Sequence, residues 1–261
     1  MKKYTGSCYI GVVGPSLEYG AANDSIDNLI LRAGDWKPRK FRATKGYDAR
    51  QMHFNKWIYE SNHPFALFLD HDMVFQPDTL ERLRSHELPY VSGYYLRRRW
   101  NPIMPVHFDR QKNPKEWPMR PSLDIPVPGK LIELGAGGWG CILIHRDVAV
   151  DMRDKVLKGE DWVIEDDMDI YPYDINKMFD AIKGLKKLTE INEQKGVSLK
   201  GGIEKVALNH YVNELVEEFR PLRGTKDPVG SDLRFPFFAR QAGYKLMLDP
   251  DVQCKHITKY E

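Results

Sequence analysis

Short, nearly continuous runs of hydrophobic residues recur along the first third of the chain. They lie at residues 9–13, 65–69 and 89–95. Runs of this length with few or no polar residues predict buried strands of a sheet. A shorter segment at 40–43 is expected to form one more strand.

Between these runs, hydrophobic residues recur at helical spacing. The first helix is expected to end near Gly34, and the second to begin at Asp48, which suits an N-cap. The buried face of the second helix is expected to carry Met52, Trp57 and Ile58. A third helix should begin near Pro77. This alternation predicts an α/β fold with a mostly parallel sheet that is flanked by helices.

The second half of the chain is patterned differently. Two apolar segments, 131–134 and 141–144, predict strands on either side of the glycine-rich stretch 135–140. Residues 237–243 are typical of a helix end with a glycine C-cap. A last strand is predicted at 245–248, before Pro250.

Composition narrows the functional classes. The chain has 261 residues, a formal net charge of +2 and 42% hydrophobic residues, which is ordinary for a globular protein and does not mark a general nucleic-acid binder. Its three cysteines are widely spaced, which disfavours a disulfide framework and a structural zinc site and suits a reducing compartment. No segment reaches the length of a signal-peptide core or a membrane span, so we expect a cytoplasmic protein.

Two carboxylates follow the apolar run at 65–69. Asp70 and Asp72 are spaced i, i+2 around His71, at the point where a strand should end. In a strand this spacing puts both carboxylates on one face, where their oxygens suit a hard cation such as Mg²⁺ or Mn²⁺. The alternative is a strand followed by a polar turn, in which aspartate is common.

Several segments occur in an order that resembles one family. They are 45–50, Asp70-x-Asp72, Gly137–Gly140, Ser231–Phe235, Ala242–Lys245 and His256. This set resembles the GT-A-fold, nucleotide-sugar-dependent glycosyltransferases, in particular the large group that contains inverting enzymes, and is similar to glycosyltransferases encoded by phages. The resemblance covers nearly the whole chain except about 162–228.

The resemblance implies a GT-A, Rossmann-like fold: a mixed, mostly parallel sheet flanked by helices, in a single domain over 1–261. It implies a nucleotide-binding half at about 1–100 and an acceptor half at 101–261. Within the acceptor half, apolar residues recur at helical spacing over about 162–228, which predicts a helical insertion. The implied activity is transfer of a sugar from a UDP- or GDP-sugar to a hydroxyl acceptor, with Mn²⁺ or Mg²⁺ as cofactor.

The resemblance also implies ligands for the metal and the diphosphate. Asp70, Asp72 and His256 would hold the ion, which stabilises the leaving diphosphate. A solvent-exposed tail histidine is the alternative for His256. Arg50 matches a cation near the nucleotide, where a guanidinium can bind phosphate. Its alternative is an exposed helical arginine.

Further positions would surround the donor. Gly11, Val13 and Pro15 would flank the base, as the first strand of the family does. Gly138 and Trp139 would lie beside the donor sugar, with the indole face open to a sugar ring. Alternatively, the glycines in this stretch only permit positive φ in a hairpin loop.

Asp232 matches the position of the general base in this family. A carboxylate there takes the proton of the acceptor hydroxyl as its oxygen attacks the anomeric carbon. This chain has Ser231 before it, where the family usually has glutamate, and Pro236 lies one turn into the expected helix. The alternative is a retaining mechanism, which needs no protein base at this position.

The acceptor is open between a glycan and modified DNA. A basic, aromatic-interleaved segment would suit a polyanionic acceptor such as DNA, and it contains Arg97, Arg98, Arg99, Trp100, Arg110, Lys112 and Lys115. The alternative is a solvated charged face. Nothing in the sequence indicates an oligomeric state.

Three other functions compete with the transferase. One is a non-catalytic nucleotide- or sugar-binding module. A second is a nucleotidyltransferase, although 11–20 lacks the expected basic glycine-rich loop. A third is a non-haem iron oxygenase, because His107 and Asp109 have facial-triad spacing, with His145 or His210 as a third ligand. That chemistry is usual in an all-β barrel, which the strand–helix alternation disfavours.

Overall fold

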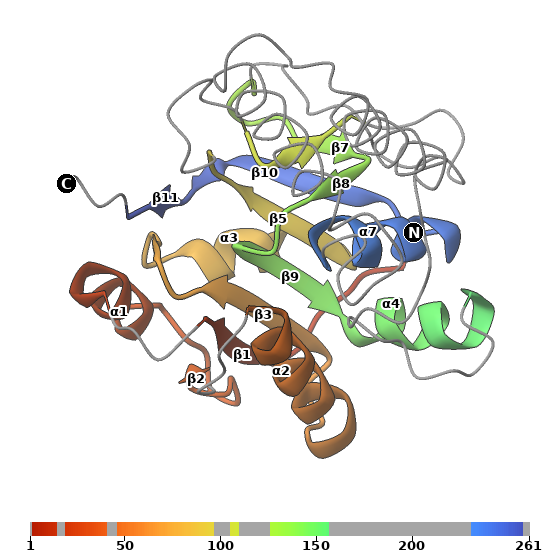
Figure 1. Cartoon of the computed structure of the whole chain (residues 1–261), viewed down its shortest axis with the longest axis horizontal. Helices are drawn as coiled ribbons and strands as arrows, with labels where there is room; N and C mark the ends of the chain where they lie inside the picture. The colour runs from red at the N-terminus through yellow and green to blue at the C-terminus, as the bar shows by residue number, and fades with distance from the viewer. Residues whose placement is uncertain are drawn as a thin grey trace, which may run out of the picture. The chain divides into compact units, whose positions relative to one another are not determined.

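The computed structural model describes residues 2–14, 19–40, 46–96, 105–109, 126–156 and 231–257, without the side chains of 39–40, 46–48 and 231–233. Within these ranges the core is a seven-stranded sheet in the order β2-β1-β3-β9-β5-β10-β7 (Figure 1). Its strands are β1 (Cys8–Val13), β2 (Arg39–Lys40), β3 (Phe65–Asp70), β5 (Tyr90–Tyr94), β7 (Ile132–Leu134), β9 (Cys141–His145) and β10 (Leu246–Gln253).

The sheet is mixed but mostly parallel. Strands β1, β2, β3, β5 and β10 share one direction, whereas β9 and the edge strand β7 run the opposite way. The central strand β9 pairs antiparallel with β3 on one side and with β5 on the other. The predicted α/β class is therefore confirmed, and the arrangement is Rossmann-like.

Helices cover both faces of this sheet (Figure 1). Helices α1 (Gly20–Asp27) and α3 (Thr79–Ser85) pack on one face, where their apolar residues join one cluster. Helices α2 (Gly46–Glu60) and α7 (Ser231–Gln241) pack on the other, where Phe54 of α2 lies 5.8 Å from Phe235 of α7 between ring centroids.

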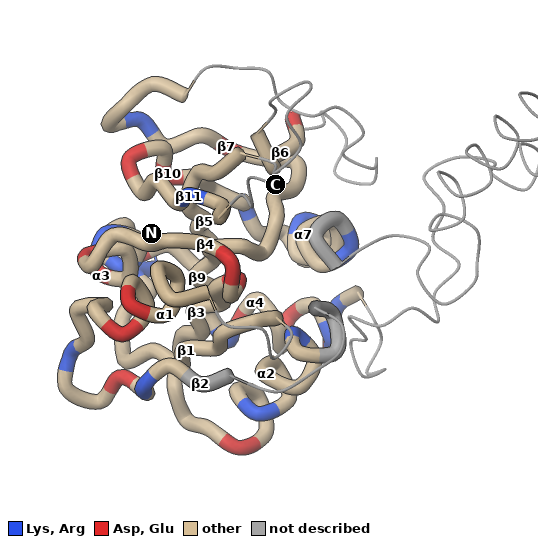
Figure 2. Tube along the Cα trace, turned by 60° about the vertical axis from the view of Figure 1, so that its left-hand side comes forward, with Lys and Arg blue, Asp and Glu red and all other residues tan. Residues whose placement is uncertain are grey.

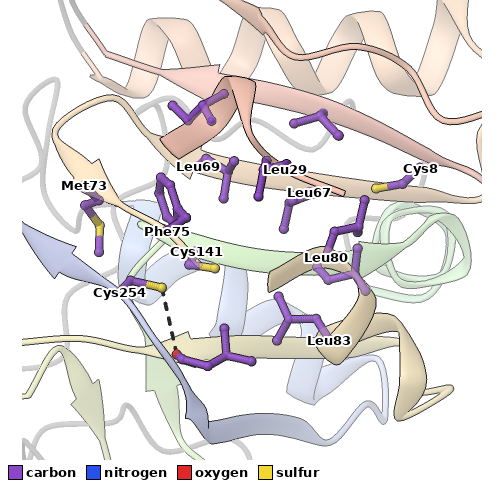
Figure 3. Close-up of a cluster of buried hydrophobic side chains, with 14 of the residues drawn as sticks. Cys8, Leu29, Leu67, Leu69, Met73, Phe75, Leu80, Leu83, Cys141 and Cys254 are labelled. Atoms are coloured by element: carbon purple, nitrogen blue, oxygen red, sulfur yellow. Dashed lines mark hydrogen bonds between the residues drawn. The ribbon is translucent and has the colours of Figure 1, made fainter. Parts of the chain in front are cut away.

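The face under α1 and α3 is apolar. Alternate residues of β1 and β3 point into it, among them Ile10, Leu67 and Leu69. Figure 3 shows Leu67, Leu80 and Leu83 gathered in this cluster, with Cys141 and Cys254 at its border. All three cysteines are buried free thiols, and burial raises the pKa of the Cys8 thiol.

The face under α2 and α7 is aromatic. The ring of Phe68 stacks on Phe54 at 6.1 Å and meets the edge of Trp139 at 5.0 Å. Trp139 in turn meets Phe235 at 5.0 Å. Such pairs contribute more than their buried area alone, by about 0.5–1.5 kcal/mol each. The aromatic cluster thus joins α2, β3 and α7 around Trp139.

Two short strand pairs form separate two-stranded sheets. Strand β4 (Met73–Val74) pairs antiparallel with β11 (Lys255–His256), and β6 (His107–Phe108) pairs antiparallel with β8 (Ala136–Gly137). After β9 come α4 (Arg146–Asp151) and a π-helical turn, η1 (Met152–Val156).

Arg146 ties the end of β9 to the end of α2. Its guanidinium donates hydrogen bonds of 2.7 Å to the carbonyl oxygens of Trp57, Ile58 and Ser61. These carbonyls lie at the C-terminus of α2 or just beyond it, where helical carbonyls lack intrahelical donors and a cation is favoured by the helix dipole. The α2 helix is therefore fixed to β9 at this end.

Several local expectations are wrong. Strands β7 and β9 do not form a hairpin around 135–140, because β7 lies at the sheet edge beside β10 and β9 lies at the centre. Asp48 lies inside α2, which begins at Gly46. Met52 is 44% exposed, since the buried face of α2 is carried by Ala49, His53, Phe54 and Trp57.

One expectation falls outside what the structure describes. The chain divides into one unit of 1–164 with 231–261 and a second stretch, 165–230, which lies outside the described residues. The predicted helical insertion at 162–228 therefore stays a prediction. Among the described helices, none has both the length and the apolar character that crossing a bilayer requires.

Candidate functional site

The carboxyl ends of the parallel strands meet at one edge of the sheet. Val13 at the end of β1 pairs with Asp70 at the end of β3, and Tyr94 at the end of β5 pairs with Gln253 of β10. Because β9 runs the opposite way, the glycine-rich loop before it reaches the same edge, where the amide of Asp70 donates to the Gly140 carbonyl over 3.0 Å. In open α/β sheets this edge is where ligands bind.

Asp70 is the last residue of β3 and faces α2. Its Oδ1 lies 3.3 Å from Nη2 of Arg50 in the second turn of α2, and the two side chains are 21% and 13% exposed. The Arg50 guanidinium also lies 5.7 Å from the ring centroid of Trp139, within cation–π range. Arg50 is thus not an exposed helical arginine, and the structure brings three predicted site residues together.

Asp72 and His256 lie far apart in the sequence but meet at this edge. His256 of β11 pairs with Met73 of β4, and the amide of Ile257 donates to the Asp72 carbonyl over 2.9 Å. Asp72 is 2% exposed, which a solvated polar turn would not be. The late histidine therefore returns beside the second aspartate, as the resemblance implies.

The imidazole of His256 has a defined orientation. Its Nδ1 lies 2.6 Å from the carbonyl oxygen of Leu96, and its ring meets the edge of Tyr95 at 5.3 Å. A carbonyl can only accept, so Nδ1 carries the proton and the lone pair of the neutral ring is on Nε2. Histidines that ligate metals are commonly held by such a bond from their other nitrogen.

The residue types at this edge suit a divalent cation. Two carboxylates and an imidazole supply oxygen and nitrogen donors of the kind that Mn²⁺ and Mg²⁺ accept. Their side chains do not, however, converge in one cluster: no three His, Cys, Asp or Glu side chains within the described ranges are close enough together to ligate one ion. Asp70 is instead engaged by Arg50.

His71, between the two aspartates, points away from them. Its Nδ1 donates to the carbonyl of Val13 over 3.2 Å, and its ring lies over Gly14 at a place that a Cβ would occupy. Gly14 has a φ of +150°, which also favours glycine. His71 therefore fixes the end of β1 against the end of β3.

The glycines of the 135–140 stretch serve close packing. None of them has a positive φ, so that alternative is wrong. A Cβ at Gly138 or Gly140 would overlap the phenol of Tyr95, whose hydroxyl accepts a 2.8 Å hydrogen bond from the Gly140 amide. Tyr95 was not among the residues that sequence reasoning selected, because a tyrosine at a strand end carries no distinguishing signal.

Trp139 is not an open sugar platform in this structure. Its side chain is 0% exposed and is enclosed by Phe68, Phe235 and the guanidinium of Arg50. The expectation of an indole face open to a sugar ring is therefore wrong. The indole ring instead packs against the guanidinium of Arg50.

The first strand meets α2 through His53. A Cβ at Gly11 would lie 2.8 Å from the His53 ring, whose Nε2 donates to the Val12 carbonyl over 2.9 Å. Burial lowers the pKa of His53 to about 4, so the ring is neutral and its Nδ1 accepts from the hydroxyl of Tyr9. Gly11 thus lies under α2, whereas Val13 reaches the edge.

The remaining predicted residues are only partly described. Pro15 lies outside the described residues, as do Arg97 and the rest of the basic segment up to Lys115. The backbone of Asp232 lies in the first turn of α7, and its side chain is not described. Pro236 lies inside α7 as expected.

In the view of Figure 2, lysine and arginine positions are interspersed with aspartate and glutamate positions along the described trace. The described fold disfavours the iron oxygenase. His107 is 2% exposed in β6, which pairs with β8, and the mixed α/β sheet is not the all-β barrel that an iron oxygenase would need.

Comparisons with known proteins add little. No family model and no curated protein matches the sequence. Among solved structures, the crystal structure of A197 from STIV is similar to this chain, with a TM-score of 0.36 and 17% sequence identity. The match covers 54% of this chain and 66% of that one, which is just under two thirds of its length.

Proposed function

We propose that this chain is a metal-dependent glycosyltransferase, which moves a sugar from a UDP- or GDP-sugar to a hydroxyl acceptor. One observation carries the proposal: three separate segments deliver Arg50, the Asp70 and Asp72 pair, and His256 to one edge of an α/β sheet. This edge offers a cationic group for a diphosphate beside acidic and imidazole ligands for a cation. A sugar nucleotide bound with its metal ion presents the complementary pair of charges.

In this proposal each part of the donor has its own residues. Val13 and Pro15 flank the nucleotide base, and Gly138 lies beside the sugar, whereas the buried Gly11 and Trp139 support α2 and Arg50. Arg50 binds the diphosphate with its guanidinium, which can form paired hydrogen bonds to phosphate.

Asp70, Asp72 and His256 would hold Mn²⁺ or Mg²⁺. When bound, the ion neutralises the charge that develops on the leaving diphosphate. Asp70 now pairs with Arg50, and His256 has Nε2 as its accepting nitrogen. Binding of the donor would therefore require Arg50 to exchange the carboxylate for phosphate.

Asp232 is proposed as the general base. At the start of α7, its carboxylate would take the proton of the acceptor hydroxyl as the oxygen attacks the anomeric carbon and the diphosphate leaves. The product then has the inverted anomeric configuration. A retaining transfer would need no protein base at this position.

The acceptor is proposed to be a glycan or modified DNA. The basic segment 97–115 would bind the phosphates of a DNA acceptor, since arginine and aromatic residues interleave there. We also propose that the protein acts in the cytoplasm, of the host if it is phage-encoded, because its three buried thiols suit a reducing compartment.

The test of the donor site is a binding measurement on Asp72→Asn. Affinity for UDP and GDP is measured by calorimetry with and without Mn²⁺, and Asp27→Asn on the exposed side of α1 serves as the matched control. Loss of the Mn²⁺-dependent part in Asp72→Asn alone is expected. Equal Mn²⁺-dependent affinity in both variants would sink the metal assignment.

The test of the chemistry uses Asp232→Asn. Turnover with a panel of sugar nucleotides should fall by about 10²–10⁴-fold, while donor affinity stays the same. Anomeric configuration of the product is read by NMR. A retained configuration rules out Asp232 as the base of a single displacement, and donor binding without any turnover by the native protein favours a binding module.

A further inference from the structure

The guanidinium of Arg50 has two neighbours of different kinds. Its Nη2 lies 3.3 Å from Oδ1 of Asp70, and its Cζ lies 5.7 Å from the ring centroid of Trp139. The contact with the carboxylate is longer than the usual charge-assisted hydrogen bond of about 2.7–2.9 Å. Both charged side chains keep some exposure to solvent, whereas the indole is fully buried. The ion pair is therefore the weaker of the two constraints on the guanidinium.

The backbones that carry the two charges are fixed. Arg50 lies in the second turn of α2, and three residues later the Nε2 of His53 donates to the Val12 carbonyl over 2.9 Å. On the other side, the amide of Asp70 donates to the Gly140 carbonyl over 3.0 Å. Because both backbones are held, the ion pair can open by rotation of the two side chains alone.

A carboxylate and a phosphate group compete for the same guanidinium. Both present anionic oxygens, and arginine binds either of them through the same N–H groups. The Asp70 carboxylate therefore stands where a phosphate oxygen of the ligand would bind to Arg50. The contact with Trp139 does not take part in this competition, because an indole offers the face of its ring and no acceptor.

We propose that Asp70 is an internal competitor, which holds Arg50 in the ligand-free protein and lowers the affinity of the site for phosphate groups until a diphosphate displaces it. The inference rests on the proposed function and deepens it, because it assigns a regulatory contact to the same site. Apparent affinity falls by the fraction of molecules in which Arg50 is released. Weak anions such as inorganic phosphate are thereby kept out, whereas a ligand with further contacts still binds.

The experiment measures binding of inorganic pyrophosphate by calorimetry, in a buffer with EDTA, so that only the protein's own groups act on the anion. Asp70→Asn removes the competing charge and keeps the shape of the side chain. Asp27→Asn on the exposed side of α1 is the matched control, because it changes the net charge by the same amount. Arg50→Gln is measured alone and together with Asp70→Asn.

Asp70→Asn should bind pyrophosphate about fivefold more tightly than the native protein, which corresponds to the loss of a partly exposed ion pair of about 1 kcal/mol. Asp27→Asn should bind like the native protein. Arg50→Gln should bind more weakly, and adding Asp70→Asn to it should restore little, because the competitor then has nothing to hold. Thermal melts check folding, and Asp70→Ser replaces Asp70→Asn if that variant does not fold.

Three results overturn the inference alone. They are native-like or weaker pyrophosphate affinity in folded Asp70→Asn, an equal gain in the Arg50→Gln background, and no pyrophosphate binding with EDTA by either the native protein or Asp70→Asn while UDP or GDP still binds with Mn²⁺. Absence of binding of pyrophosphate, UDP and GDP by the native protein, with and without Mn²⁺, overturns it together with the proposed function.

Discussion

The two faces of the sheet bury different kinds of side chain. Under α1 and α3, alternate residues of β1 and β3 form an apolar cluster that includes Ile10, Leu67 and Leu69. Under α2 and α7, the neighbouring residues of the same strands are Tyr9, Gly11, Phe68 and Asp70, which meet aromatic rings, His53 and Arg50.

Within one strand, the residues that face α1 and α3 therefore contribute mainly to stability, whereas those that face α2 and α7 contribute to the candidate site. Burial of apolar surface contributes about 25 cal/mol per Å², and the cluster of the first face stabilises the fold in this way. The second face carries polar groups that cost free energy to bury unless they are paired. Polar residues on that face reach the carboxyl edge, so we expect substitutions there to alter ligand binding more than stability.

The largest effect is expected from Leu67→Ala. Leu67 is fully buried in the interior strand β3, and its truncation leaves a cavity. The free energy of unfolding should therefore fall by about 3–4 kcal/mol. Urea denaturation measures the loss. Binding of nucleotide and Mn²⁺ should be native-like at a temperature where the variant is folded.

The comparison is sharpened by the next residue of the strand. Phe68→Leu changes the support of Trp139, which lies under Arg50, so this variant should weaken nucleotide binding. Equal changes of nucleotide affinity in Leu67→Ala and Phe68→Leu would show that the two faces are not functionally distinct.

The next largest effect is a loss of folding stability at acidic pH. Burial lowers the pKa of His53 from its ordinary value of 6.5 to about 4, so between these pH values the unfolded chain binds more protons than the folded one. Stability from the neutral ring is complete above pH 6.5 and declines as the pH falls towards 4, by about 3 kcal/mol in total.

Urea denaturation at several pH values tests this. Burial also lowers the pKa of His63 and of His145, so these two histidines contribute to the pH dependence of stability in the same direction as His53. The native protein is therefore compared with His53→Gln, which keeps a donor but does not titrate. The variant should have a shallower pH dependence, and parallel curves would contradict the prediction.

The smallest effect on stability is expected from Arg50→Gln. The Arg50–Asp70 pair is partly exposed and 3.3 Å long, so its loss should lower stability by less than about 1 kcal/mol. The same change removes the guanidinium proposed to bind diphosphate, which should weaken UDP or GDP binding by about tenfold. Lys56→Gln, on the outer side of α2, is the control, and equal nucleotide affinity in both variants would remove Arg50 from the site.

The sequence predicted those elements whose signal is local. Strands β1, β3 and β9 are nearly continuous apolar runs, β5 is a short run interrupted by Ser92, and Gly243 ends α7 with a φ of +95° as its C-cap pattern indicates. The alternation of strand and helix was also sufficient for the mixed, mostly parallel sheet.

Non-local features could not be predicted in this way. Nothing between 131 and 145 indicates that β7 pairs with β10 while β9 inserts between β3 and β5, because partners are chosen by packing of distant segments. Pro250 lies inside β10, which runs to Gln253 with an irregular register against β5, although proline suggested the end of a strand.

The candidate site likewise combines local features, which the sequence predicted, with non-local features, which it did not. The Asp70 and Asp72 pair was found from its spacing at a strand end. Burial of Trp139 and the contacts of Tyr95 depend on helices and loops far away in sequence, and the Gly138 and Gly140 requirement follows from those contacts.

The central position of β9 has a consequence for how the chain becomes structured during synthesis. Residues 141–145 lie between β3 and β5, so a nascent chain that ends near residue 100 has no partner for the facing edges of these two strands. Unpaired strand edges are sites of wrong association. The first hundred residues are therefore not a separable half. The sheet can therefore be completed only after β9, and then β10, have been synthesised.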